Sequence, residues 1–209
     1  ESDGWNLLAS SDEWVSPVHT EVGPDGSVWI LDWYNFIIQH NPTPPGFENG
    51  EGNAHINPLR DKQRGRIYKM SYKNGTKGKT FKLDKSNPKG LLVALKSENM
   101  LWRNHAQRLL IERNNTDVLG QLFAIIDNQK VDEIGLNSPA VHALWTLHGL
   151  GVMDGSHQKA LQIAKDALKH PAAGVRKAAL QVLPKDVNTF AELTKNGLFR
   201  LKFNKKAFI

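Results

Sequence analysis

Hydrophobic and polar positions change their period at about residue 90 of this sequence. Before that point, apolar residues recur at every second position or in short runs, which is typical of β-strands. After it, they recur three or four residues apart, which is typical of helices that bury one face. The pattern predicts an α+β chain: an antiparallel β unit over residues 1–72, a polar linker over 73–89, and an all-α repeat unit over 90–209.

The N-terminal part is expected to form short, mostly antiparallel strands. Gly23-Pro24-Asp25-Gly26 has the residue types of a tight turn. It precedes the continuous apolar run Val28–Leu31, which predicts a strand buried on both faces. Proline and glycine exclude regular structure from about residue 41 to 63, within a long loop that spans 34–63. The expected strands are residues 5–10, 15–22, 28–32 and 65–72, with one further β excursion at 80–83.

The C-terminal part is expected to form a series of helices. Asp117 and Ser156 are the predicted N-caps, and Pro139 and Pro171 are predicted in first helical turns, where proline is tolerated. The predicted helical segments are 91–95, 101–111, 118–126, 140–150, 160–168 and 175–183, with a final helix near 190–195.

These helices carry an internal repeat. Ala106, Ala143 and Ala179 are spaced by 37 and 36 residues, and a leucine follows each of them four positions later, at Leu110, Leu147 and Leu183. Arg103 and Arg176 stand three positions before their alanines, where the middle unit has Ala140. Small residues at helix crossings with leucines on the same face predict stacked helix pairs, here a short right-handed solenoid of about three pairs.

Composition removes several classes of function. The chain has no cysteine, which excludes disulfides, thiolate metal sites and a cysteine nucleophile. No apolar run is long enough to span a membrane. The net charge of +6 comes from scattered residues without a nucleic-acid-binding motif, so we interpret it as a solvated surface and expect no nucleic-acid partner. Binding of an anionic polymer by a basic helical face stays open as a third hypothesis.

Two segments of this chain resemble known families. Trp102-Arg103-x-x-Ala106-Gln107-Arg108-Leu109 and Pro171-x-x-x-Val175-Arg176-x-x-Ala179 resemble HEAT repeats. Residues 18–68 resemble the closing blade of bacterial glucose/sorbosone dehydrogenase-like (membrane-bound dehydrogenase type) β-propellers. There, a Gly-Pro-Asp-Gly turn precedes a strand that ends in Asp-Trp-Tyr-Asn, and an Arg-Gly-Arg-Ile-Tyr strand follows a loop. Together the resemblances cover about residues 5–185.

The resemblance implies a fragment of a large, exported multidomain protein, located in the periplasm or otherwise outside the cytoplasm. The missing initiator Met and the absence of a signal-peptide pattern fit an expectation that the targeting segment lies elsewhere. The helical repeats would be a structural and protein-interaction module without catalysis of their own, in contact with other domains of the parent chain and with a protein partner. The alternative is a contribution to the active site of a quinone-dependent sugar or alcohol dehydrogenase.

The same resemblance bears on cofactors. It implies no cofactor in this fragment, whereas the parent protein would carry pyrroloquinoline quinone, or haem c on a separate domain. Because the propeller's catalytic base and cofactor contacts belong to other blades, we assign no catalytic residue here.

Polar residues at the end of strand 28–32 and in the loop beyond it form the candidate ligand site. The hypothesis is that they line a site for a polar, sugar-like ligand, and the proposed residues are Asp32, Tyr34, Asn35, His40, Arg60 and Arg64. The alternative is structural: Asp32 and Asn35 cap backbone groups, and Arg64 or Arg66 pairs with Asp61.

The last predictions concern metal binding, the histidines on the helices and the tryptophans on the helices. Asp32, His40 and His55 are suitable ligand types, but they lack a recognised ligand spacing, so no metal site is assigned. The helical histidines, such as His142, are expected to form hydrogen bonds between repeats. Trp102 and Trp145 are expected in the core.

Overall fold

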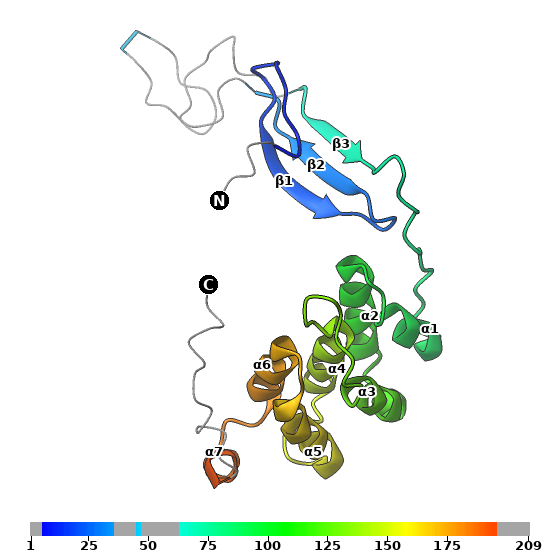
Figure 1. The fold of residues 1–209 in the computed structure, drawn as a ribbon, viewed down its shortest axis with the longest axis vertical. Coiled ribbons are helices and arrows are strands. Elements are labelled where there is room, and N and C mark those ends of the chain that lie inside the picture. The colour runs from blue at the N-terminus through cyan, green and yellow to red at the C-terminus, as the bar shows by residue number, and fades with distance from the viewer. Residues whose placement is uncertain (1–5, 36–44, 47–62, 196–209) are drawn as a thin grey trace. The chain divides into compact units, whose positions relative to one another are not determined.

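The structure is a computed structural model that describes residues 6–35, 45–46 and 63–195. The chain divides into two compact units, residues 1–80 and 81–209. The described residues contain a small antiparallel sheet in the first unit and α-helices in the second, so the predicted α+β class is confirmed at this level (Figure 1). No helix among them is both long and apolar enough to cross a membrane.

The first unit contains a three-stranded antiparallel sheet in the order β1-β2-β3 (Figure 1). Its strands are β1 (Pro17–Val22), β2 (Val28–Asp32) and β3 (Arg66–Met70). The strand expected at 5–10 is absent over residues 6–10, where Leu7 is exposed and no residue takes part in the sheet. The excursion expected at 80–83 is also absent, because Phe81 and Leu83 pack against the helical core instead.

The turn between β1 and β2 is fixed by Gly23 and Asp25. The Gly23 amide donates to the Ser27 carbonyl at 2.8 Å. A side chain at Gly23 would put Cβ 2.2 Å from the indole nitrogen of Trp29, so the close approach of this ring requires glycine. Asp25 accepts a hydrogen bond from the Lys69 ammonium on β3 at 2.6 Å, which lowers the pKa of Asp25 to about 2.

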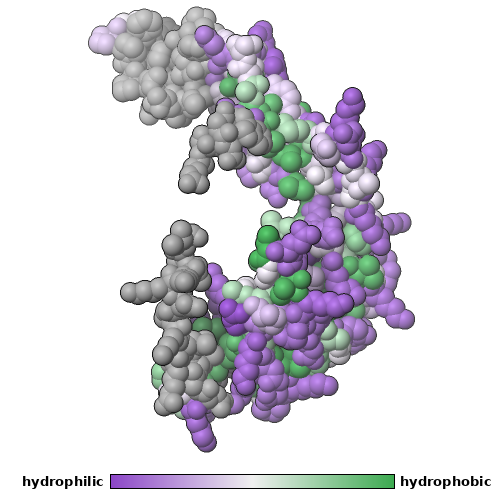
Figure 2. Space-filling view, in the orientation of Figure 1, coloured by the Kyte–Doolittle hydropathy of each residue, from purple (hydrophilic) through white to green (hydrophobic). Residues whose placement is uncertain are grey.

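Strand β2 is buried on one face only, so the expectation of burial on both faces is wrong. Ile30 and Asp32 are 1% and 3% exposed, whereas Trp29 and Leu31 on the opposite face are 38% and 42% exposed. Ile67 of β3 lies opposite Leu31 and is exposed too. A three-stranded sheet is a single layer, and within the described residues nothing buries this second face. Figure 2 shows hydrophobic surface over the sheet.

The second unit contains the helices α1 (Pro88–Ala94), α2 (Met100–Arg113), η2 (Thr116–Val118), α3 (Leu119–Ile126), α4 (Ser138–Gly149), α5 (Gln158–Asp166), η3 (Ala167–Lys169), α6 (Ala173–Val182) and α7 (Val187–Lys195). Helix α4 packs against α2 on one side and α6 on the other. Helices α1, α3 and α5 pack against α2, α4 and α6 respectively. The repeated alanines 106, 143 and 179 and the leucines 110, 147 and 183 are all buried in the core.

Asparagine supplies the helix caps in the first half of this unit. The side chains of Asn87, Asn99, Asn115 and Asn137 each accept a hydrogen bond from a backbone amide in the following first turn. The predicted caps Asp117 and Ser156 are wrong: Asp117 pairs with Arg113, and Ser156 bonds to Asp154. Pro139 stands in the first turn of α4 as expected, whereas Pro171 precedes the N-cap of α6.

Two helical glycines provide a matched prediction. A Cβ at Gly149 would lie 2.4 Å from Cδ1 of Ile111, where the ends of α4 and α2 approach, whereas one at Gly120 of α3 would meet nothing within 4 Å. We expect Gly149→Ala to lower the free energy of unfolding by about 1 kcal/mol, since overpacking exceeds the gain in helix propensity. Gly120→Ala should raise it by about 0.5–1 kcal/mol. Urea unfolding followed by circular dichroism measures both, and stabilisation by both would contradict the close approach.

Candidate functional site

The predicted ligand site is built around the buried carboxylate of Asp32, the last residue of β2. One carboxylate oxygen, Oδ1, accepts from the backbone amides of Ser16 at 2.7 Å and Tyr34 at 2.9 Å. The other, Oδ2, accepts from the hydroxyl of Tyr68 on β3 at 3.2 Å. Asp32 therefore ties the chain before β1, the exit from β2 and the third strand to one point.

Tyr34 forms the second half of this cluster. Its backbone is left-handed, with φ 48°, a conformation that a bulky residue adopts only when its surroundings hold it there. Its hydroxyl donates to Asp12 Oδ2 at 2.9 Å, and the Arg66 guanidinium carbon lies 3.4 Å from the ring centroid. The backbone amide of Trp14 and the Tyr34 hydroxyl both bond to Asp12 and hold the pKa of this carboxyl below its ordinary value.

This arrangement matches the structural alternative more closely than an open ligand site. Both oxygens of Asp32 accept hydrogen bonds from the protein, and Tyr34 is occupied on its hydroxyl and on one ring face. Asn35 is buried, and its carbonyl accepts from the Ser16 hydroxyl at 3.2 Å. The cluster can orient the loop that leaves β2, and any ligand chemistry there would have to displace these bonds.

Of the remaining predicted residues, only Arg64 is among the described residues. Arg64 is exposed just before β3, and its neighbour Arg66 provides the guanidinium at the cluster. His40, His55, Arg60 and Asp61 lie outside the described residues. Among the residues that are described, no three His, Asp or Glu side chains are placed to hold a metal ion.

Sequence reasoning missed four members of this cluster, Asp12, Trp14, Ser16 and Tyr68, and it considered Arg66 only as a partner of Asp61. The strand register is the signal that could have found some of them. In the antiparallel pairing, Asp32 lies opposite Arg66 on β3 and Pro17 on β1. Residues that flank these partners therefore lie within reach of the carboxylate.

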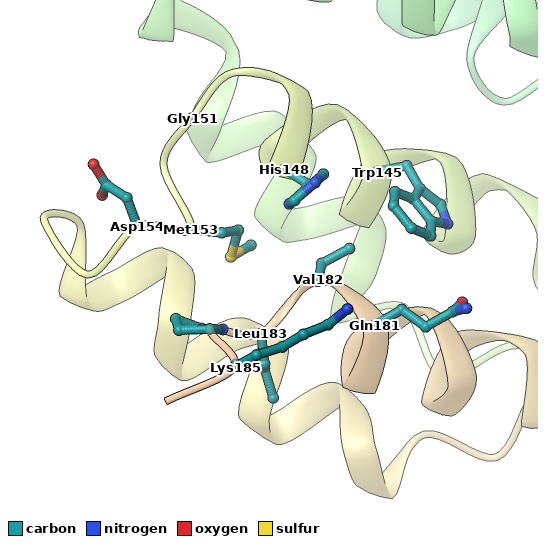
Figure 3. A pocket seen from close by; sticks show the side chains of 10 residues that line it. Trp145, His148, Gly151, Met153, Asp154, Gln181, Val182, Leu183 and Lys185 are labelled. Carbon is teal, nitrogen blue, oxygen red and sulfur yellow. The ribbon is translucent and has the colours of Figure 1, made fainter. Parts of the chain in front are cut away.

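The second candidate is an open pocket of about 530 Å³ in the helical unit (Figure 3). Helix α4 contributes Trp145 and His148, and α6 contributes Gln181 and Val182. The segments that follow these two helices complete the lining with Gly151, Met153, Asp154, Leu183, Pro184 and Lys185. Its volume lies in the range of ordinary ligand and side-chain pockets. Trp145 thus lines a pocket as well as packing against the core, so its expected core position is right only in part.

The helical unit repeats a specific backbone contact. Arg103 Nη1 donates to the carbonyls of residues 97 and 98 at 2.7 and 2.6 Å. Arg176 Nη1 donates to the carbonyls of residues 170 and 171 at 2.8 and 2.7 Å. In both cases the acceptors lie six and five positions before the arginine, at the entrance to its helix. The same side chain therefore closes the same turn in two units of the repeat.

The loops between helix pairs are also joined. The carbonyl of Asn128, after α3, accepts from Asn137 Nδ2 at 2.7 Å and pairs with Nε2 of the buried His170 at 3.0 Å. The amide of Ala172 donates to His170 Nδ1, so Nε2 carries the proton. The Asn128 carbonyl, which bonds to both Asn137 and His170, therefore joins the entrance of α4 to the entrance of α6.

His142 connects α4 to α2, as predicted for a histidine that hydrogen-bonds between repeats. Its Nδ1 lies 2.7 Å from Gln107 Oε1, which can only accept, so Nδ1 donates. Burial, together with the nearby Arg103 guanidinium, lowers the pKa of His142 to about 4. Both causes disfavour the imidazolium, because burial and a nearby positive charge each favour the neutral ring.

Acid should therefore weaken the helical unit through His142. Because its folded pKa is about 4 and its ordinary value is 6.5, its contribution is complete above pH 6.5 and is lost as the pH falls towards 4. We expect a loss of about 2 kcal/mol in the free energy of unfolding over that window, after allowance for partial exposure. His142→Asn keeps a donor for Gln107 and should flatten this part of the pH profile, as measured by urea unfolding at a series of pH values. An unchanged profile in the variant would contradict the assignment.

The comparison with known families gives a match within the first unit. A family described as "Domain of unknown function (DUF7133)" matches residues 1–74. No curated protein and no solved structure matches the chain. The description of the family names no activity, so a function has to be proposed from the contacts described above.

Proposed function

We propose that the helical unit is a short HEAT-like solenoid that acts as a non-catalytic protein-interaction module of a larger exported, dehydrogenase-like protein. The equivalent backbone contacts of Arg103 and Arg176 are the observation that carries this proposal. A repeated residue that makes the same bonds at the same offsets is expected of stacked units built on one plan. The serial packing of α2, α4 and α6 supports it further.

In the same proposal, the N-terminal sheet is part of a propeller blade that other chain segments cover. Support comes from Trp29, Leu31 and Ile67, which leave one sheet face exposed and apolar. A small single-layer sheet needs a second layer to be stable, and blades of a propeller cover one another. Location outside the cytoplasm, and a quinone or haem c bound by other domains, belong to this proposal as well.

The alternative function is part of a sugar or alcohol dehydrogenase site around Asp32. Its support is the cluster of Asp32, Tyr34 and Arg66, which places a buried carboxylate beside a guanidinium and two tyrosine rings. We favour a structural role for this cluster, because the polar atoms of Asp32 and Tyr34 already bond within the protein.

An activity assay of the full chain separates the two functions. We expect no turnover with sugars or alcohols in the presence of pyrroloquinoline quinone and an artificial electron acceptor. In the same proposal, chemical crosslinking of the full chain in extracytoplasmic extracts should join lysines of the helical unit to another protein. Turnover that Asp32→Asn abolishes while the variant stays folded would favour the enzyme instead.

A further inference from the structure

The pocket at the ends of α4 and α6 has a buried apolar floor. Met153, Val182 and Leu183 are buried, and Trp145 is partly buried (Figure 3). The Trp145 and His148 rings meet edge to face, with centroids 5.5 Å apart and planes at 87°. An apolar floor beside an aromatic ring, open to solvent, suits one large apolar side chain from outside.

The charged side chains of the two helices that border this floor are all basic. Helices α4 and α6 contain no Asp or Glu. Lys177 is exposed one helical turn before Gln181 on α6, and Lys185 is exposed at the rim. Because residues four apart share a helix face, Lys177 lies on the Gln181 side of the pocket.

Two carboxylates, Asp154 and Asp186, lie close to this rim, and both stay negatively charged while they accept hydrogen bonds from neighbouring residues. Asp154 accepts from the amide and hydroxyl of Ser156, which holds the pKa of Asp154 below its usual range. In Figure 3 its carboxylate points away from the other labelled side chains. Asp186 accepts from the Thr189 amide in the first turn of α7 at 2.7 Å. Within the described residues, neither carboxylate forms an ion pair with Lys177 or Lys185, and both lysines are exposed.

We propose that this pocket binds an acidic segment of a partner protein, with one large apolar side chain on the floor and flanking carboxylates paired with Lys177 and Lys185. The inference rests on the proposed interaction role and names the chemistry of the partner. Charge complementarity selects this occupant over the two others that the chain itself offers. Residues 196–209 contain Arg200, Lys202, Lys205 and Lys206 and no acidic residue, and a second copy would bring Lys177 and Lys185 against the same two lysines.

Fluorescence anisotropy of the full chain with designed peptides tests the proposal. The probes are fluorescein-labelled peptides of about twelve residues, rich in Glu and Asp, with one central Leu, Phe, Met or Trp. We expect saturable binding of at least one of them. Replacing its central residue by Ser, or its acidic residues by Lys, should weaken binding about tenfold or more.

Variants of the chain locate the binding. Lys177→Glu with Lys185→Glu should weaken binding about tenfold, and Trp145→Ala should do the same. The matched control is Lys130→Glu, the same charge reversal beyond the opposite end of α4, and it should change binding less than twofold. If Trp145→Ala fails to fold, the lysine reversals and the peptide with central Ser decide the question.

Three results of the peptide assay would overturn the inference. They are no binding of any acidic peptide, equal weakening by the Lys130 and Lys185 reversals, and binding that appears only after removal of residues 196–209, which would make that segment the occupant. Dimerisation that Lys185→Glu abolishes would point to a second copy instead. A protein crosslinked to another face of the helical unit would contradict this pocket while leaving the proposed interaction role intact.

Discussion

Leu147→Ala is expected to lower the free energy of unfolding of the helical unit by about 3 kcal/mol. Leu147 is fully buried on α4, the helix that packs against both α2 and α6. Truncation removes apolar contacts and leaves a cavity where three helices meet, which the surrounding backbone cannot close. Urea unfolding of the full chain, followed by circular dichroism at the helical signal, measures the change.

The matched control is Leu180→Ala on α6. Leu180 is 48% exposed, so its truncation should cost less than about 1 kcal/mol. Equal effects of the two substitutions would show that α4 is not the central helix of the unit. The repeated leucine at position 147 would then not have the packing role that its spacing predicts.

Asp32→Ala is expected to destabilise the N-terminal unit by about 3 kcal/mol. The substitution leaves the amides of Ser16 and Tyr34 and the hydroxyl of Tyr68 without their acceptor at a buried point. Each buried donor left unpaired costs about 1–3 kcal/mol, and partial access of water to the cavity recovers some of the total. Hydrogen exchange of the β2 amides in the full chain measures this local stability.

Glu21→Ala on β1 is the control, since this carboxylate is mostly exposed and pairs with the exposed side chain of His19 on the same strand. It should leave exchange in β2 nearly unchanged. If Asp32→Ala behaved like this control, the cluster would not hold the strand ends together. A ligand role for Asp32 would then regain support.

The burial of the repeated alanines and leucines could be predicted because the same small and apolar residues recur at one position of successive helical segments. The alanines and leucines at 36- and 37-residue spacing are the residues that α2, α4 and α6 bury. The caps were harder to predict, because Asn, Asp and Ser all suit the position and only the backbone geometry shows that Asn115 accepts the bond. The strand expected near residue 7 failed because alternation over a few residues does not supply a pairing partner.

The candidate sites depend on contacts between distant segments. Asp32 was singled out correctly as a polar residue at a strand end, but Ser16 and Tyr68 reach it only through the strand pairing. The pocket beside Trp145 could not be predicted from periodicity, because its lining comes from the ends of α4 and α6 and the segments after them. Its shape is set by the packing of those two helices.

The central claim is that the functional surface of this chain lies on the helical unit and not at Asp32. Hydrogen exchange of the full chain, with and without a bound acidic peptide from the set above, tests it most directly. The account predicts slower exchange in residues 145–153 and 177–185, with no change in residues 12–35. Slower exchange centred on residues 12–35, with residues 145–185 unaffected, would contradict it.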